Sequence, residues 1–252
     1  VDFSKYDWDG DGEVDQVYVI YAGYGEADSG KENTIWPHEW QLSGASQSMI
    51  LDGVKVDTYA CSSELNGAGE IGGIGTMCHE FSHCMGIPDM YDTGYSGNFG
   101  MGPFDLMDYG AYNEDGYKPC GYTAYERMIS GWIDPIEVRK GAELSVTGMK
   151  ALTEGGEAYK LINSGNDDEY FLVENRQFSG WDESLPQSGV LITHVDFDQT
   201  VWDYNMVNTT GYDSDLQFTN PHQRMTIFHA DNDDDSKYYS KNQQGYTKTT
   251  YL

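Results

Sequence analysis

The first part of the chain combines strand-like and helix-like patterns of apolar residues. An almost unbroken apolar run over residues 17–22 predicts a central strand that is covered on both faces. Weak alternation over residues 49–59 predicts a hairpin that turns at Asp52 and Gly53. Because a helical pattern follows over residues 123–132, we expect a domain of mixed α+β class.

Between these elements, residues 74–85 predict a helix with two different faces. At about 100° per residue, four apolar side chains gather on one side. They are Ile74, Cys78, Phe81 and Met85. We expect this side to pack inward. Gly86 then favours the end of the helix, and Pro88 forbids its continuation.

From residue 136 onward the pattern changes to short strands separated by glycine and aspartate turns. The strand-like runs cover residues 144–146, 159–162, 170–176 and 189–196. No long helical pattern lies between them, which is typical of an all-β module such as a β-sandwich. We therefore predict an α+β domain over residues 1–135 and a sandwich-like domain over residues 136–252.

Composition and charge narrow the classes of function. The 252 residues include 42 acidic and 14 basic ones, for a net charge of -28. A nucleic-acid-binding protein normally carries a basic patch, and the sequence has none, so we expect no nucleic-acid partner. No run of 18 apolar residues is present, so we expect no membrane span. The acidic run Asp231–Asp235 is expected to be a solvated loop.

The predicted helix also carries the strongest chemical signal in the chain. His79 and His83 are four residues apart, so both imidazoles project from one face of a helix. Glu80 directly follows His79, so its side chain projects beside the two imidazoles and can reach a water on the same metal. The chain must turn after the helix, which would bring Asp89 back towards the metal. The pattern predicts a zinc site with His79, His83 and Asp89 as ligands.

Residues 77–92, MCHEFSHCMGIPDMYD, resemble the zinc site of the immune inhibitor A family of secreted bacterial metallopeptidases. Their spacing H-E-x-x-H-x-x-G-x-x-D is similar to the long zinc signature of metzincin-like peptidases, with aspartate in place of the usual final histidine. The likeness reaches over most of the chain and is strongest at residues 7–24, 74–109 and 170–196.

This resemblance implies a function and a fold for the first domain. It would be a zincin-like catalytic domain, in which a mixed sheet lies beside the zinc-site helix. The enzyme would be a secreted, zinc-dependent endopeptidase that hydrolyses protein or peptide substrates with a metal-activated water, and Glu80 would be the general base. Relatives have a propeptide and further catalytic-domain residues before a segment like residues 1–15. We therefore expect an extracellular or cell-surface protein whose signal, propeptide and N-terminal catalytic part are not in this chain.

The resemblance also suggests roles for two residues after the helix. In the family, an Asp-Leu-Met sequence forms a turn beneath the metal, and Met107 matches its methionine. In some related zincins a tyrosine two residues further on stabilises the transition-state oxyanion, so Tyr109 is a candidate for catalysis. The alternative for Tyr109 is an aromatic side chain that packs in a loop.

Residues 7–15, DWDGDGEVD, form the second candidate metal site. Alternating aspartates with glycine at the sixth position match the first half of a calcium loop. We expect oxygen ligands from the carboxylates of Asp7, Asp9, Asp11 and Asp15 and from the carbonyl of Glu13. Tyr18 replaces the closing glutamate of an EF-hand, and a strand follows in place of a helix. A similar loop precedes a strand in the family. The alternative is an acidic turn without an ion.

Other interpretations remain open. Glu126 could be the third zinc ligand, as in another class of zincins. The protein could also be a calcium- and zinc-stabilised binding or adhesion module without catalysis. His38 is more consistent with a structural histidine than with a substrate contact. His194 and Asp196 share a strand face, yet no third metal ligand accompanies them.

The four cysteines allow more than one arrangement. Cys78 and Cys84 point in different directions from the predicted helix, which excludes a disulfide between them. Two pairings with Cys61 and Cys120 remain, and four buried thiols are equally compatible with the sequence.

Overall fold

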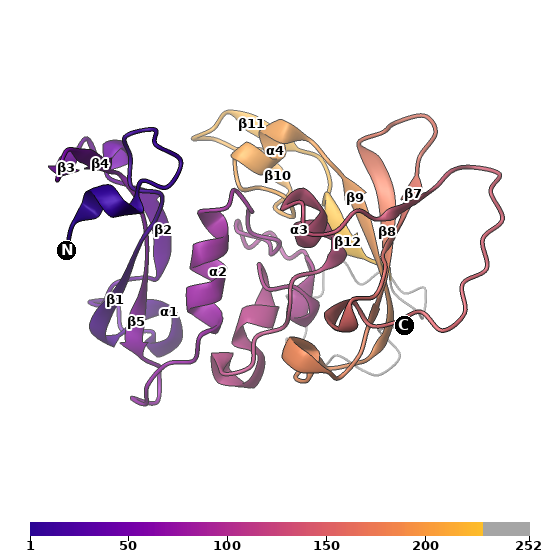
Figure 1. Ribbon diagram of the computed structural model, residues 1–252, viewed down its shortest axis with the longest axis horizontal. Helices are drawn as coiled ribbons and strands as arrows, with labels where there is room; N and C mark the ends of the chain where they lie inside the picture. The colour runs from indigo at the N-terminus through magenta and orange to yellow at the C-terminus, as the bar shows by residue number, and fades with distance from the viewer. Residues whose placement is uncertain (229–252) are drawn as a thin grey trace. The chain divides into compact units, whose positions relative to one another are not determined.

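The computed structural model describes residues 1–228. The chain divides into two compact units, Val1–Ile87 and the chain from Pro88 onward (Figure 1). The second unit groups residues 88–135 with the strand-rich part of the chain. The expected domains 1–135 and 136–252 stay a prediction. The acidic run Asp231–Asp235 lies outside the described residues.

The first unit is built around a sheet in the order β1-β5-β2. Its elements are η1 (Phe3–Tyr6), β1 (Val17–Tyr24), α1 (Glu26–Ser29), β2 (His38–Gln41), η2 (Ser43–Ala45), β3 (Met49–Leu51), β4 (Val54–Val56), β5 (Thr58–Leu65) and α2 (Gly75–His83). Strand β1 runs parallel to β5, and β2 runs antiparallel to it. Helix α2 packs against β5 and β2, so the predicted zinc helix lies on this sheet.

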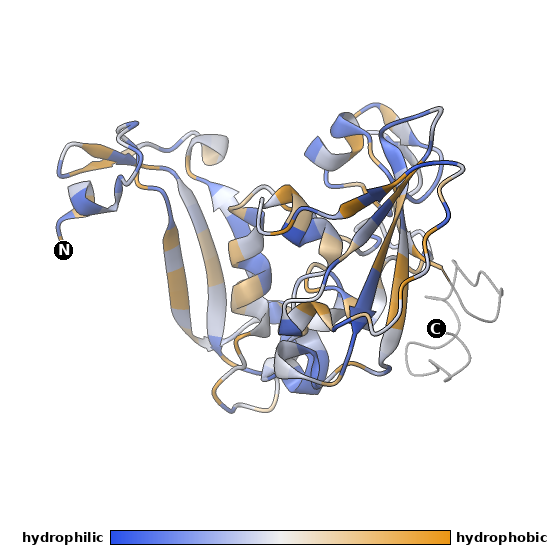
Figure 2. Cartoon of the chain, turned by 45° about the vertical axis from the view of Figure 1, so that its right-hand side comes forward, coloured by the Kyte–Doolittle hydropathy of each residue, from blue (hydrophilic) through white to orange (hydrophobic). Residues whose placement is uncertain are grey.

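Strand β1 corrects the expectation of a central strand. Within the described residues β1 pairs with β5 alone, which makes it an edge strand. Ile20 is 62% exposed and Val19 is also exposed, although the strand carries hydrophobic positions along its length (Figure 2). The apolar run predicted the strand correctly, but hydropathy does not specify where a strand lies in its sheet.

The predicted hairpin forms from β3 and β4. Asp52 and Gly53 have φ values of 52° and 89°, and positive φ at both central positions is what a type I′ turn needs. Val54 and Val56 pack with Val14 in a small core. This core anchors the acidic loop of residues 7–15 to the hairpin.

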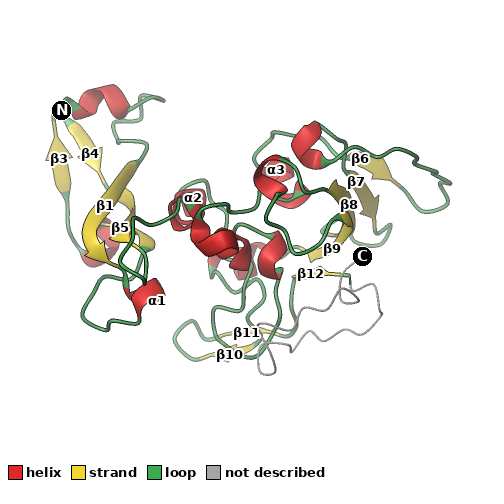
Figure 3. Cartoon of the chain, turned by 90° about the horizontal axis from the view of Figure 1, so that it is seen from below, coloured by secondary structure: helices red, strands yellow, loops and turns green. Residues whose placement is uncertain are grey.

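The second unit contains a sheet in the order β12-β9-β8-β7-β6, whose strands are labelled in Figure 3. Its elements are η3 (Gly102–Phe104), η4 (Tyr109–Gly116), α3 (Ala124–Ile129), β6 (Ile136–Val138), η5 (Leu152–Glu154), β7 (Tyr159–Ile162), β8 (Glu169–Arg176), η6 (Gly180–Asp182), β9 (Gly189–Asp196), α4 (Gln199–Asp203), β10 (Gly211–Asp213), β11 (Phe218–Asn220) and β12 (Met225–Ile227). The predicted strands at 159–162, 170–176 and 189–196 are confirmed. Residues 144–146 form no strand.

The elements that pack on this sheet differ from the second sheet that a sandwich would place there. Every second residue of β8 is buried, and helix α3 and the 3-10 helix η5 pack against this strand. Strands β10 and β11 form a separate pair. Within residues 88–228 the second unit is therefore a mixed sheet with helical segments against β8, in place of two facing sheets. The reason lies in the charged side chains that β8 turns inward.

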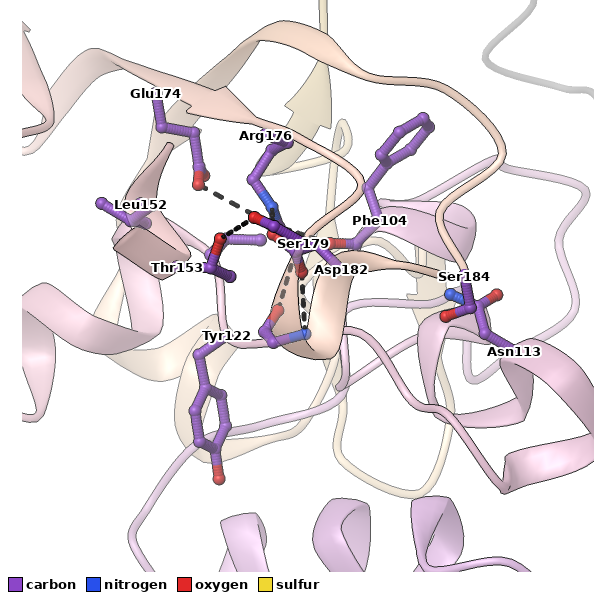
Figure 4. Close-up of polar contacts among 12 residues, drawn as sticks. Phe104, Asn113, Tyr122, Leu152, Thr153, Glu174, Arg176, Ser179, Asp182 and Ser184 are labelled. Atoms are coloured by element: carbon purple, nitrogen blue, oxygen red, sulfur yellow. Dashed lines mark hydrogen bonds and ion pairs between the residues drawn. The ribbon is translucent and has the colours of Figure 1, made fainter. Parts of the chain in front are cut away.

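Arg176 and Glu174 are these inward charges. Arg176 is 1% exposed and donates to both carboxylate oxygens of Asp182, at 2.7 Å each. It also donates to the carbonyls of Phe104 and Gly121, at 3.2 and 2.9 Å (Figure 4). These bonds need backbone partners from segment 104–121, which a second apolar sheet would not provide.

The cysteines follow the alternative without disulfides. All four thiols are free; Cys61 and Cys120 are buried, and Cys78 and Cys84 are half-buried. Burial raises the pKa of each thiol, with that of Cys84 reaching about 11. These thiols therefore stay protonated and unreactive at neutral pH.

Candidate metal centre

Helix α2 ends where its sequence predicts. Gly86 adopts a left-handed φ of 80° and donates its backbone N–H to the carbonyl of His83 at 2.8 Å. This geometry is the usual glycine stop of a helix. The chain therefore leaves the helix directly after His83, as the spacing of the motif requires.

Three side chains of α2 form the centre. His79, Glu80 and His83 offer ligand atoms that all lie within 4.8 Å of one another. Nδ1 of His83 donates to the carbonyl of Ile87 at 2.8 Å, which fixes the ring and makes Nε2 the candidate ligating nitrogen. Two imidazoles and a neighbouring carboxylate suit zinc. The residues present therefore fit the predicted metal.

The burial of α2 is opposite to the expected one. Ile74, Phe81 and Met85 are each about 40% exposed, whereas Glu80 and Ser82 are buried. The prediction of an inward apolar face is wrong. Helical spacing groups residues on a face, but it does not decide which face meets the sheet.

Two sheet residues that sequence reasoning missed lie close to this centre. Tyr18 and Glu39 both pair with Ala60 of β5, from opposite sides, so they share one face of the sheet. Burial raises the pKa of Tyr18 well above its ordinary value, and the charge of Glu80 adds to this shift. Burial also raises the pKa of Glu39, and His83 opposes that shift. No motif marks either residue; only the strand pairing brings them to the helix.

His38 has the structural role that was favoured. Its Nδ1 donates to the carbonyl of Trp36 at 2.7 Å, and its Nε2 accepts from the hydroxyl of Tyr59 at 2.9 Å. Both ring nitrogens are thus used within the first unit, where they hold the start of β2 against β5.

Asp89 belongs to the second unit and is buried. Its backbone N–H donates to Oδ1 of Asn205 at 2.7 Å, and Nδ2 of Asn205 donates to its Oδ2 at 2.6 Å. The three-residue cluster of α2 does not include Asp89. Its role as the third ligand stays a prediction.

The turn around Met107 is built from buried aspartates. Met107 is fully buried, and its carbonyl accepts from the N–H of Met90 at 2.8 Å. Asp105 accepts from the N–H of Met107 at 2.7 Å, and Asp108 accepts from that of Tyr109 at 2.7 Å. Tyr109 is half-exposed, with its ring 5.8 Å from that of Tyr112. The placement of Met107 and Tyr109 beside a metal stays a prediction.

The other candidate ligands have structural partners. Glu126 is fully buried and closes a capping box with Thr123 at the start of α3. His194 contacts Glu169 at 3.1 Å, and Asp196 pairs with Arg224 at 2.8 Å. These contacts favour structural roles for all three.

The acidic loop of residues 7–15 brings together part of the expected calcium ligands. Asp7, Asp9 and Asp15 form a group whose carboxylate oxygens lie within 4.8 Å of one another. Asp11 instead accepts from the N–H of Glu13 at 2.8 Å. The carboxylate of Glu13 contacts Lys55 at 3.1 Å, and ligation through the carbonyl of Glu13 stays a prediction.

Comparisons with known proteins agree with the motif. The family model described as "Immune inhibitor A peptidase M6, catalytic domain" matches residues 2–131. Among curated proteins, the chain is similar to Immune inhibitor A of Bacillus thuringiensis subsp. alesti, with 33% identity over 162 residues that cover 54% of this chain and 23% of the relative. It is also similar to Pre-pro-metalloprotease PrtV of Vibrio cholerae serotype O1 (strain M66-2), with 28% identity over 145 residues that cover 50% of this chain and 16% of the relative.

The chain thus spans less than a quarter of the length of these curated relatives. None of the helices in residues 1–228 has both the length and the hydropathy needed to cross a bilayer.

Proposed function

This chain belongs to the immune inhibitor A peptidase M6 family, and from that premise we propose that it acts as a secreted zinc-dependent endopeptidase. The family match gives it a metallopeptidase catalytic domain. One observation carries the proposal: His79, Glu80 and His83 converge on one helix inside the matched segment. The substrates would be proteins or peptides.

Zinc is the metal that we assign to this centre, with His79, His83 and Asp89 as its protein ligands. Once bound, it would act as a Lewis acid and lower the pKa of a coordinated water. His83 would ligate through Nε2, because its Nδ1 is held by the carbonyl of Ile87. The assignment of Asp89 is supported by its spacing from the histidines.

Glu80 is the general base in this proposal. Its carboxylate would take a proton from the attacking water and pass it to the leaving amine. Glu80 is only 7% exposed, and a buried carboxylate interacts more strongly with nearby charges than an exposed one does. The half-exposed phenol of Tyr109 is the candidate donor to the developing oxyanion.

A structural calcium ion in the loop of residues 7–15 is the second part of the proposal. The carboxylates of Asp7, Asp9 and Asp15 lie close together and would repel one another without a cation. Asp11 and the carbonyl of Glu13 are the further oxygen donors. Hard oxygen ligands of this kind favour calcium.

The test compares the full chain with two glutamine variants, using a denatured protein as substrate. Glu80→Gln should bind one zinc but lose hydrolysis, because glutamine cannot accept the proton. Glu70→Gln, which changes an exposed carboxylate before α2, should hydrolyse at the unchanged rate. Zinc content is measured on each variant, and a zinc chelator should stop the active ones.

Two results would contradict the proposal. Hydrolysis by Glu80→Gln at the normal rate would remove Glu80 from the mechanism. A zinc-loaded wild-type chain that cleaves no denatured protein would favour the binding or adhesion module.

A further inference from the structure

Asn205 makes a two-point contact with Asp89. The amide oxygen accepts the backbone N–H of Asp89 at 2.7 Å, and the amide nitrogen donates to its Oδ2 at 2.6 Å. The two residues are 116 positions apart in the chain. A side chain held at both its backbone and its carboxylate cannot rotate without breaking a hydrogen bond.

The backbone of Asn205 suits this contact. Asn205 follows helix α4 and has a left-handed φ of 54°, a conformation that asparagine tolerates better than most residues. Its carbonyl accepts from the hydroxyl of Thr93 at 3.0 Å. Asn205 therefore contacts the segment after the zinc helix through both its side chain and its backbone.

The neighbouring residues hold the same segment at other points. Asn208 donates to the carbonyl of Met90 at 2.7 Å and accepts from the N–H of Met225 at 3.1 Å. Asn98 donates to the carbonyl of Asn208 at 2.8 Å. These contacts stabilise the backbone of the segment, but none of them touches the carboxylate of Asp89. Among these asparagines, Asn205 is the one that contacts the carboxylate of Asp89.

We propose that Asn205 is a positioning residue for the metal centre: it orients the carboxylate of Asp89 for coordination. This inference rests on the proposed function, in which Asp89 is the third zinc ligand. With Oδ2 held by the amide, coordination would use Oδ1. Asn205 lies beyond the segment that the family model matches, residues 2–131. The proposal therefore assigns a role at the metal centre to a residue of the strand-rich part of the chain.

A hydrogen bond to a ligating carboxylate has a known effect on metal affinity. It fixes the ligand before the metal arrives, so less freedom is lost on binding. Loss of such an outer contact typically weakens metal binding about 10–100-fold. We expect the loss of the Asn205 contact to weaken zinc binding by a factor in the same range.

The experiment measures zinc affinity of the full chain by competition with a chelator, and urea unfolding of the metal-free chain. Asn205→Gly deletes the amide and keeps the left-handed backbone accessible. Asn205→Ser is a second variant whose short hydroxyl cannot reach both groups of Asp89. Asn208→Ala is the control, because it loosens the same segment without a contact to the carboxylate.

Both Asn205 variants should raise the zinc dissociation constant about 10–100-fold and shift the absorption bands of the cobalt-substituted protein. Asn208→Ala should lower the stability of the metal-free chain and leave zinc affinity and the cobalt spectrum unchanged. Normal zinc affinity and spectrum in both Asn205 variants would overturn the inference. An equal loss of affinity in Asn208→Ala would also overturn it, because general loosening would then explain the effect.

Asp89→Asn separates this inference from the proposed function. If Asp89→Asn binds zinc normally, Asp89 is not a ligand, and both the ligand set and the inference fail. If Asp89→Asn loses zinc while the Asn205 variants keep it, the ligand set holds and only the role of Asn205 is refuted.

Discussion

Replacing Arg176 with methionine should destabilise the chain by about 4 kcal/mol. Methionine has a similar length, so the change removes the charge and the donors and leaves most of the volume. The guanidinium contacts Asp182 twice at 2.7 Å and lies 3.6 Å from Glu174. It also bonds to the carbonyls of Phe104 and Gly121 (Figure 4). All of these groups lose a partner at once.

The magnitude follows from burial. The side chains of Arg176, Asp182 and Glu174 are each at most 2% exposed, so water cannot replace the lost cation. Removal of one member of a buried ion pair typically costs about 3–5 kcal/mol. The pKa of Glu174 is raised to about 7 by burial, so this residue can relieve part of the cost by taking up a proton. The middle of the range, about 4 kcal/mol, is a factor of about a thousand in the unfolding equilibrium.

The assay is urea unfolding of the full chain, followed by tryptophan fluorescence. Arg139→Met is the matched control, because the Arg139–Glu137 pair is at the surface, with side chains 70% and 52% exposed. Such pairs contribute about 1 kcal/mol or less. Equal losses in Arg176→Met and Arg139→Met would refute the reasoning from burial. Adding Asp182→Asn and Glu174→Gln to Arg176→Met should recover part of the stability, since the uncompensated charges would be gone.

Three further predictions concern pH, packing and calcium. The native state keeps the proton of Glu174 up to about pH 7, whereas the unfolded chain releases it near the ordinary value of 4.5. The stability that this proton contributes is therefore present below pH 4.5 and is lost as the pH rises through 7, a decrease of about 3 kcal/mol in the free energy of unfolding. A Glu174→Gln variant should lack this part of the decrease when unfolding is measured between pH 5 and pH 8. Gly110→Ala should lower the free energy of unfolding in urea by about 3 kcal/mol, because the new methyl group would overlap the thiol of Cys120 and the carbonyl of Asp105. Gly72→Ala is the control, because that position has room for a methyl group, and equal stability of the two variants would contradict this reasoning. Calcium should raise the melting temperature of the wild-type chain and leave that of Asp7→Asn unchanged, and the absence of any shift in wild type would remove the ion from loop 7–15.

The elements that could be predicted have local causes. The hairpin turns at Asp52 and Gly53 because these residue types accept positive φ. The helix of the zinc motif ends at Gly86 for the same reason. Helix α3 begins at a capping box of Thr123 and Glu126, three residues apart. Each signal lies within a few residues of the structure that it produces.

The elements that were predicted wrongly depend on distant partners. The apolar strand β1 was expected at the centre of its sheet, and it is an edge strand. The apolar side of α2 was expected inside, and Phe81 on that side is 40% exposed. The sandwich was expected because glycine and aspartate turns separate the strands and no long helical pattern lies between them. The inward charges of Arg176 and Glu174 are instead matched by backbone groups of Phe104, Gly121 and Ala124. Hydropathy alone cannot indicate these partners.

The sequence by itself determined the family and the chemistry of the centre, because a helix turns His79 and His83 to one face wherever that helix lies. It also predicted the acidic loop and the strands β7, β8 and β9 of the second unit. Only the tertiary structure decided that Tyr18 and Glu39 flank Ala60 near the centre, and that Asn205 contacts Asp89 across 116 residues. A helical period is set by neighbouring residues, whereas a contact between distant residues depends on how every intervening element packs.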